Sequence, residues 1–213
     1  TMICKSIVES SYAYSIANNH DISEITLKLD IYIIRMKILL NFISYYESIF
    51  QAILQINNFI EEVTSYLTAS NEKVLRITWS FFNKFTQDTA VLEGVLKKPK
   101  VQQNLTSIFC KNNKVSQSKM LKFAAKVWKN NDQKCITSKK LLCDILNPVI
   151  STIINAYTLR FTIYKDEIII KKRMKDFFDG IELLSNVQGC QEFAQRVIRR
   201  VNDDVSNMKS QMK

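Results

Sequence analysis

Hydrophobic residues between positions 41 and 66 recur at alternating intervals of three and four. A polar series, mostly Asn, Gln and Ser, follows the same rhythm one position earlier. Because a helix places two such series on separate faces, the spacing predicts a helix over 41–66 with the polar series at the surface. Upstream the pattern continues without Gly or Pro, so one helix of over 40 residues and a break near Asp30 or Asn41 are both open. The hydrophobic series, predicted to be buried, is Phe42, Tyr45, Ile49, Ala52, Ile56, Phe59, Val63 and Tyr66; a second row, Leu39, Ile43, Tyr46, Phe50, Ile53, Ile60 and Leu67, widens the buried stripe.

Helical spacing also covers most of the chain after residue 70. Ser70 or Asn71 is expected to cap a helix that runs to about Leu96, and Pro99 places a turn over 97–100. Further helices are expected over 101–110, from Ser116 or Ser118 to about 130, from Ser138 to Pro148, and from Gln191 to about Met208. Between them, 149–168 fits a helix better than a hairpin, because no Gly or Asn supplies the turn. Gly180 and Gly189 are predicted helix ends.

The scarcity of Gly and Pro supports the same fold class. The chain has 3 Gly and 2 Pro in 213 residues, whereas average usage gives roughly 15 and 11. Hairpins and phosphate-binding loops need residues that tolerate positive φ, and helices do not. We therefore predict an all-α fold, a single compact multi-helix bundle over residues 1–213 with one or two long central helices. The longest uncharged stretch, residues 145–159, is too short to span a membrane.

Positive charge is concentrated in the second half of the chain. Residues 1–93 carry 7 Lys or Arg and 10 Asp or Glu, and residues 94–213 carry 23 and 10. This divides the predicted domain into an acidic-leaning half and a basic half. Such asymmetry suits an anionic partner, although a soluble, solvated face explains it equally well.

Two clusters of basic residues are the candidate polyanion-binding site. In the first, lysines at intervals of three and four line one outer face of the helix that follows Ser118, where like charges at that spacing repel each other. Lys presents a point charge without the bidentate geometry of Arg, which suits sulfated glycans better than DNA bases. Trp128 beside them is expected in the core rather than in a ligand platform. The candidates are Lys119, Lys122, Lys126, Lys129, Lys139 and Lys140, and separately Lys171, Lys172, Arg173 and Lys175.

Five cysteines and one sequon bear on the compartment. No pair of cysteines has C-x-x-C spacing and the only histidine is His20, so a zinc site is not expected. Two disulfides with one free thiol allow 15 connectivities, while buried thiols of a cytosolic protein are the alternative. Asn104 begins an Asn-Leu-Thr sequon in an expected loop. Thr1 ahead of Met2 suggests a trimmed start, which favours secretion. The disulfide candidates are Cys4, Cys110, Cys135, Cys143 and Cys190.

Catalytic signatures do not appear in the sequence. His20 lies in a predicted loop, and the paired carboxylates Glu61/Glu62, Asp166/Glu167 and Asp203/Asp204 are adjacent and so point to different faces. No hydrolase, P-loop or dinucleotide motif is present. We expect neither an enzyme nor a cofactor. A helix-turn-helix reader over 116–146 is disfavoured, because the connecting loop is long and Arg is absent from 77 to 159.

A Lys/Asn/Ile-rich helical chain with the cysteines at 110, 135, 143 and 190 and one sequon resembles the secreted salivary proteins of blood-feeding flies, the mosquito neutrophil-stimulating salivary factor and its relatives. The resemblance implies a secreted, non-enzymatic protein that engages host immune or haemostatic molecules, and it transfers no site residues.

The sequence therefore predicts a secreted, disulfide-stapled helical protein that binds a host or extracellular partner, or a sulfated glycan, through its basic half. An intracellular helical adaptor or nucleic-acid-associated module is the alternative. A carrier of a hydrophobic ligand ranks third.

Overall fold

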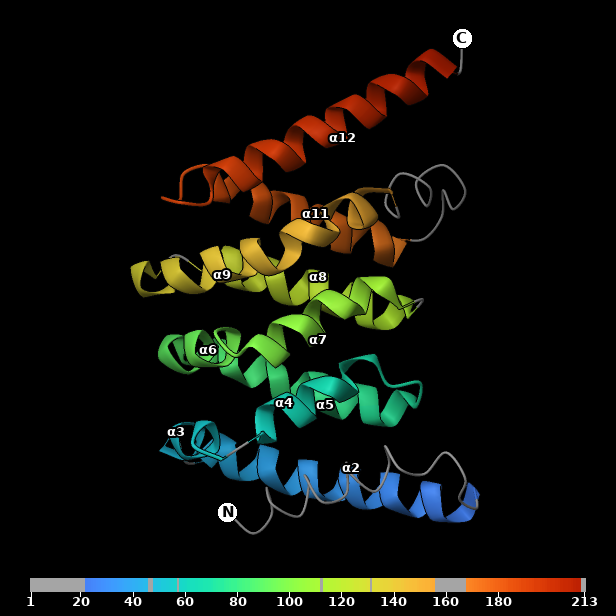
Figure 1. The fold of residues 1–213 in the computed structure, drawn as a ribbon, viewed down its shortest axis with the longest axis vertical. Helices are drawn as coiled ribbons and strands as arrows, with labels where there is room; N and C mark the ends of the chain where they lie inside the picture. The colour runs from blue at the N-terminus through green and yellow to red at the C-terminus, as the bar shows by residue number, and fades with distance from the viewer. Residues whose placement is uncertain are drawn as a thin grey trace. The chain divides into compact units, whose positions relative to one another are not determined.

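The computed structural model describes residues 22–45, 48–56, 58–111, 113–130, 132–155 and 168–211. Every regular element in these ranges is a helix, so the fold is all-α as the hydrophobic spacing predicts (Figure 1). The chain divides into two compact units, Thr1–Leu105 and Thr106–Lys213. The boundary between the units falls inside helix α7 (Pro99–Cys110). A single domain over residues 1–213 stays a prediction.

The first unit is built around a core of aromatic side chains. Phe81 and Phe85 lie edge to face with ring centroids 5.0 Å apart, and Phe59 and Phe82 each extend this cluster at 5.9 Å. All four rings are fully buried, and such edge contacts add to the burial of apolar area. The elements that supply this core and surround it are α2 (Ile22–Tyr45), α3 (Ser48–Leu54), α4 (Phe59–Ser65), η1 (Tyr66–Thr68), α5 (Glu72–Lys84), η2 (Phe85–Gln87), α6 (Thr89–Leu96) and the first part of α7.

The prediction of one continuous helix over 41–66 is wrong, because the chain forms the three helices α2, α3 and α4 there. Asn58 adopts a left-handed backbone conformation with φ 59° directly before α4. Asn tolerates that conformation better than most residues, and it interrupts the helical hydrogen-bond ladder. The hydrophobic residues keep their intervals of three and four across this break. The spacing alone therefore did not reveal the break.

The buried face of α2 also differs from the expected one. Leu39 and Ile43 of the second row are buried, while Phe42 and Tyr45 of the first row are 45% and 83% exposed. The outward row of α2 is thus apolar, and it comprises Leu27, Ile34, Ile38, Phe42 and Tyr45. In the described residues of the predicted polar series, all side chains are exposed except that of Glu62, which is half-buried.

Local capping explains where α5 and α6 begin. The Asn71 side chain accepts hydrogen bonds from the backbone N–H groups of Lys73 and Val74, as expected of an N-cap. The single helix predicted to run to Leu96 is instead divided, because the Asp88 carboxylate accepts from the N–H groups of Ala90 and Val91 and starts α6. Pro99 is the first residue of α7, a position where its missing N–H costs nothing.

The second unit has its core between α8 (Lys114–Trp128) and α11 (Ile168–Leu184). Trp128 is fully buried, and its ring centroid lies 5.2 Å from that of Phe177 and 6.0 Å from that of Phe193. Its place in the core is therefore confirmed. The remaining elements are η3 (Gln133–Cys135), α9 (Ile136–Leu146), η4 (Asn147–Val149), helical residues 150–155 and α12 (Gln191–Gln211), and the choice between helix and hairpin after residue 155 lies largely outside the described residues.

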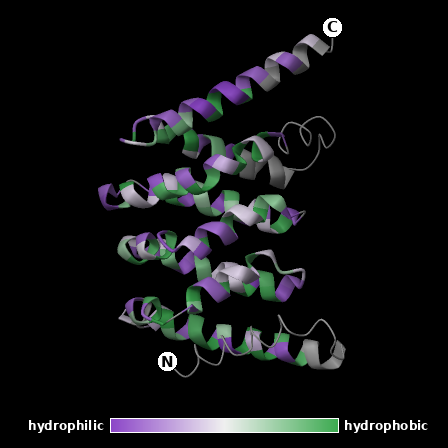
Figure 2. Ribbon diagram, in the orientation of Figure 1, coloured by the Kyte–Doolittle hydropathy of each residue, from purple (hydrophilic) through white to green (hydrophobic). Residues whose placement is uncertain are grey.

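The two glycines of this unit have different roles. Gly180 lies inside α11 rather than at its end, so the predicted cap is wrong. A Cβ atom there would come within 3.3 Å of the Trp128 ring and 3.5 Å of the Ala125 Cα, so the absence of a side chain permits close helix packing. Gly189 has φ 80° and lies in the turn between the end of α11 at Leu184 and the start of α12 at Gln191, so it does not itself end a helix as predicted. Figure 2 shows that α12 is largely hydrophilic along its length.

Candidate functional site

Helix α8 carries the first part of the predicted basic site. Its N-cap is Asn113, whose side chain accepts from the Ser116 N–H at 3.0 Å, so the expected cap at Ser116 or Ser118 is wrong. Met120, Phe123 and other apolar residues of the helix are buried. Lys122 and Lys126, one turn apart, are exposed. The helical spacing therefore positions these two ammonium groups on the outer face as predicted.

The other two lysines of α8 differ from this pair. Lys119 is half-buried. Lys129, at the C-terminal end of α8, has its Nζ 3.4 Å from both Asp176 Oδ1 and Asp179 Oδ2 of α11. These partly exposed carboxylates offset part of its positive charge. The row of four predicted lysines thus provides two exposed cations, Lys122 and Lys126.

The lysines of α9 and α11 are also divided by the fold. Lys139 is buried, 7% exposed, whereas Lys140 is exposed and its side chain lies over Gly189. Lys175 of α11 is exposed. The backbone at Lys171, Lys172 and Arg173 is helical, and their side chains lie outside the described part of the structure.

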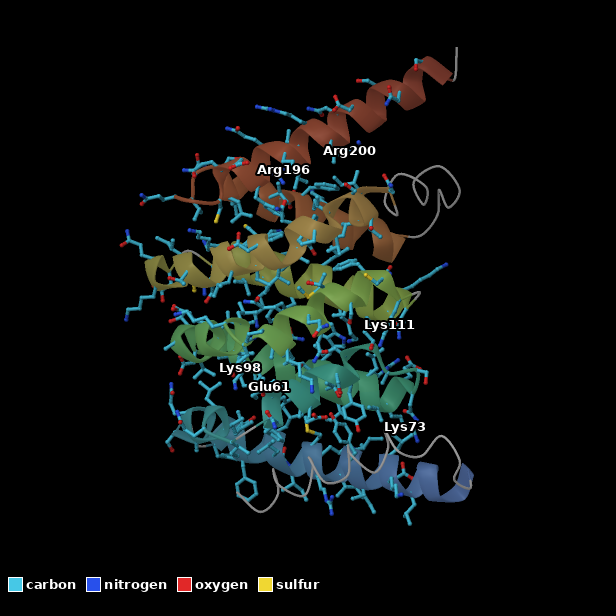
Figure 3. The ribbon with its side chains drawn as sticks, viewed as in Figure 1. Glu61, Lys73, Lys98, Lys111, Arg196 and Arg200 are labelled. Atoms are coloured by element: carbon cyan, nitrogen blue, oxygen red, sulfur yellow. The ribbon has the colours of Figure 1, made fainter. Side chains whose placement is uncertain are left out.

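Sequence reasoning missed a group of arginines on α12. Arg196 donates hydrogen bonds to Asn147 Oδ1 and Glu192 Oε1, both at 2.9 Å. Figure 3 shows Arg196 and Arg200 on this helix. The sequence signal was available in the run RVIRRVNDD, where arginines at positions 196, 199 and 200 share a helix face. Side chains of α12 line a depression of about 380 Å³, namely Glu192, Gln195, Arg196, Arg199, Arg200 and Asp203.

The charge of the chain is distributed unequally between the two units. The Thr1–Leu105 unit has ten Lys or Arg and ten Asp or Glu, and the Thr106–Lys213 unit has twenty and ten. All of the net charge of +10 therefore belongs to the second unit. Among its described side chains, exposed Lys and Arg outnumber exposed Asp and Glu by ten to five.

The described cysteines are free thiols. Cys110 is exposed, and Cys135, Cys143 and Cys190 are buried. Burial, followed by the nearby Asp132, raises the pKa of the Cys135 thiol, while Lys139 acts in the opposite direction. The predicted disulfide stapling is thus not confirmed among these four residues, and Cys4 lies outside the described part of the chain.

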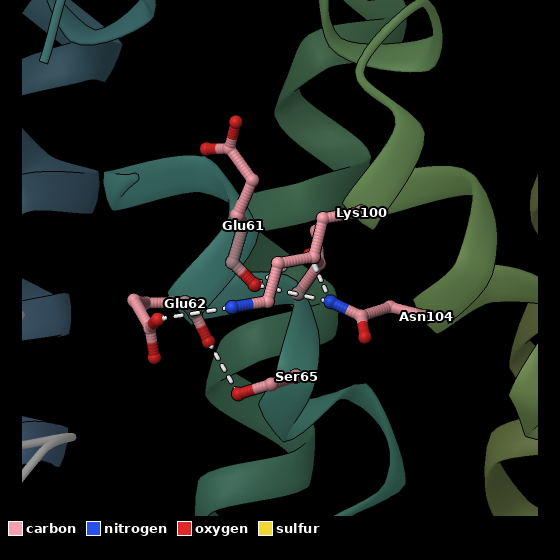
Figure 4. A network of polar contacts seen from close by, with 6 residues as sticks. Glu61, Glu62, Ser65, Lys100 and Asn104 are labelled. Atoms are coloured by element: carbon pink, nitrogen blue, oxygen red, sulfur yellow. Dashed lines mark hydrogen bonds and ion pairs between the residues drawn. The ribbon is translucent and has the colours of Figure 1, made fainter. Parts of the chain in front are cut away.

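The sequon residue Asn104 lies on α7 and not in the expected loop. Its Nδ2 donates to the Glu61 carbonyl oxygen at 3.1 Å and to Thr64 Oγ1 at 2.9 Å (Figure 4). A glycan on Nδ2 would have to replace contacts that join α4 to α7.

The adjacent carboxylates of α4 serve different partners. Glu61 Oε1 accepts from Lys98 Nζ at 2.9 Å (Figure 3). Glu62 Oε1 lies 3.4 Å from Lys100 Nζ (Figure 4). The other Glu61 oxygen, Oε2, is buried without a hydrogen bond. Each carboxylate thus faces its own lysine, so the pair is not arranged to share a proton. His20 lies outside the described residues.

Within the described ranges, no group of three or more His, Cys, Asp and Glu side chains is arranged to hold a metal ion. None of the helices in these ranges is long and apolar enough to cross a membrane.

No protein-family model matches the chain, and no curated protein matches it significantly. Among solved structures, it is similar to the crystal structure of an engineered protein, with 11% sequence identity and a TM-score of 0.40. That alignment covers 92% of this chain and 97% of the engineered one.

Proposed function

We propose that the chain is a secreted, non-enzymatic helical protein that binds a polyanionic host or extracellular partner through the basic surface of its second unit. The observation that carries this proposal is the location of the entire net charge in residues 106–213. Clustered cations raise the local concentration of an anionic ligand and accelerate its association. Sulfated glycan is the ligand class to test first, because the α8 cations are lysines.

Lys122 and Lys126 are the central residues of this proposal. Both are exposed on one face of α8. Like charges one turn apart cost a few tenths of a kcal/mol in helix stability. Binding of a sulfate-bearing chain across both ammonium groups would offset that cost. Immune or haemostatic modulation is the outcome that the salivary resemblance adds to the proposal.

A heparin column tests the proposal with matched charge changes. The double variant K122E/K126E alters the proposed site, and K37E/K73E alters two exposed lysines of the neutral unit by the same charge. We expect the wild-type protein to elute above physiological salt, K122E/K126E to elute well before it, and K37E/K73E to elute close to it. An equal decrease in the elution salt concentration of the two variants would mean that net charge, rather than the exposed lysines of α8, governs retention.

The free thiols favour the second candidate, an intracellular helical adaptor or nucleic-acid-associated module. Reduced cysteines are typical of the cytosol, and the described four are unpaired. Titration of thiols in the denatured, unreduced protein, purified from its natural source, separates the candidates. Five reactive thiols favour the intracellular protein, and a single reactive thiol, with two disulfides, favours secretion.

A further inference from the structure

Two buried cysteines of the second unit lie close enough for each thiol to shift the pKa of the other. Cys143 lies on α9 and is 3% exposed, and Cys190 directly precedes α12 and is fully buried. Each thiol is the largest single influence on the pKa of the other. A disulfide needs two cysteines at short range, and Cys143 and Cys190 are buried neighbours whose thiols are free.

The backbone around Gly189 independently shows that the turn carrying Cys190 rests on α9. A Cβ atom at Gly189 would lie 3.6 Å from the Lys140 Cδ and 3.8 Å from its Cε. Lys140 is three residues before Cys143, so both belong to the same turn of α9. The turn is closed by the Gly189 N–H, which donates to Gln191 Oε1 at 2.9 Å. The turn that carries Cys190 therefore lies beside the Lys140 side chain of α9.

The surroundings of the pair make its two sulfurs unequal. A hydrogen bond from Cys143 lowers the pKa of the Cys190 thiol, and the nearby Lys139 and Lys140 act in the same direction, against burial and Asp144. The same hydrogen bond, together with burial, raises the pKa of Cys143, which keeps its proton. Cys190 is therefore the sulfur that ionises first, and the thiolate is the nucleophile in disulfide exchange.

Neither a metal site nor another thiol explains this arrangement. No third His, Cys, Asp or Glu completes a metal-binding group with the pair in the described ranges. Cys135, also buried, has Asp132 and Lys139 as its electrostatic neighbours rather than a cysteine. Cys110 is exposed.

We propose that Cys143 and Cys190 form a reversible intrachain disulfide, with a low-molecular-weight disulfide such as oxidised glutathione as the oxidant. The Cys190 thiolate attacks one glutathione sulfur, which yields a mixed disulfide and releases one glutathione thiolate. Cys143 then loses its proton to solvent, attacks the Cys190 sulfur and displaces the second glutathione. The two protein thiols lose two electrons and two protons in total, and one oxidised glutathione becomes two reduced molecules.

The bond would tie α9 to the start of α12 and close a loop of about 48 residues. Because both sulfurs are buried, the reaction requires transient opening of the turn before α12. Oxidation should raise the melting temperature on the order of 10 °C, the shift expected for a loop of this length in a protein of this size. Reduction with dithiothreitol should reverse it.

Peptide mapping tests the proposal directly on the wild-type chain. The protein is incubated with oxidised and reduced glutathione, its remaining thiols are blocked with N-ethylmaleimide, and it is digested without reduction. Mass spectrometry should find one cross-linked peptide pair that contains Cys143 and Cys190, two hydrogens lighter than the sum of its parts. Cys110 and Cys135 should not appear in a cross-link within the chain.

Variants then separate this pair from general oxidation. C135A, which removes a buried thiol outside the pair, should keep the cross-link and the shift in melting temperature, and C143A and C190A should each lose both. Because C143A and C190A change buried residues and can fail to fold, the peptide map of the wild-type protein is the deciding measurement. Blocked maleimide adducts or separate glutathione adducts on both Cys143 and Cys190, or a cross-link between other cysteines, would overturn the proposal.

Discussion

The hydroxyl oxygens of Tyr32 and Thr78 lie 2.9 Å apart in the core of the first unit and join α2 to α5. The Thr78 hydroxyl donates its single proton to the Val74 carbonyl oxygen at 2.8 Å. Tyr32 must therefore be the donor to Thr78 Oγ1. Both residues are buried, at 2% and 0% exposure, so neither hydroxyl has water as a substitute partner.

Removal of the acceptor, the Thr78 hydroxyl, should lower the free energy of unfolding more than removal of the donor, the Tyr32 hydroxyl. The Tyr32→Phe change deletes the phenolic hydroxyl and leaves Thr78 bonded to Val74, so we expect a loss of about 1 kcal/mol in the free energy of unfolding. The Thr78→Val change leaves a buried phenol without a partner, and we expect a loss of about 2 kcal/mol. Urea denaturation measures both.

Ser80 provides the control, because its hydroxyl makes the same kind of bond, to the Arg76 carbonyl oxygen, on the exposed face of α5. Ser80→Ala should change the free energy of unfolding by less than about 0.5 kcal/mol. A Thr78→Val loss no larger than that of Tyr32→Phe would show that the phenol finds another partner.

Stability should fall at alkaline pH through Tyr32. Burial raises the pKa of this phenol above its ordinary value. Its contribution is fully present below the unfolded-state pKa of about 10 and is lost as the pH rises toward the folded-state pKa, because the unfolded chain then binds fewer protons. The free-energy difference between wild type and Tyr32→Phe should therefore shrink between pH 9 and 11.5 in urea titrations. A constant difference over this range would mean that Tyr32 ionises equally in both states.

Two helical glycines should respond oppositely to alanine. A Cβ atom at Gly94 of α6 would meet only the end of the flexible Leu54 side chain, at 3.3 Å. Gly94→Ala should therefore raise stability by about 0.5 kcal/mol, through the gain in helix propensity. Gly180→Ala places the same atom against the Trp128 ring and the Ala125 backbone, which cannot move separately. We expect a loss of about 1–3 kcal/mol.

Thermal unfolding followed by circular dichroism measures both glycine variants. Equal gains from Gly94→Ala and Gly180→Ala would mean that α8 and α11 separate at little cost, contrary to the packing of Trp128 on Phe177.

The sequence predicted the helical fold class and several helix starts because those depend on local spacing and capping. Asn71 was recognisable as a cap, since its side chain bonds to residues two and three positions later. Gly180 looked like a helix end from its identity alone. Its actual role depends on Trp128, 52 positions away in sequence, and no local signal carries that contact.

The sequence likewise predicted only the part of the candidate site that depends on local spacing. The exposure of Lys122 and Lys126 follows from the period of their own helix. The ion pairs of Lys129 with Asp176 and Asp179, and the burial of Lys139, depend on which helices become neighbours. The break before α4 was missed because Asn58 interrupts the helix without interrupting the hydrophobic spacing.

The salt dependence of binding to a heparin oligosaccharide tests the recognition of polyanions by α8 most directly. We predict that the logarithm of the association constant falls linearly with the logarithm of salt concentration, as counterions are released. The slope for K122E/K126E should be smaller than that of the wild type by about two, one for each lost lysine contact, while K37E/K73E should keep the wild-type slope. A wild-type slope in K122E/K126E, or no measurable binding by the wild-type protein at low salt, would contradict polyanion recognition through α8.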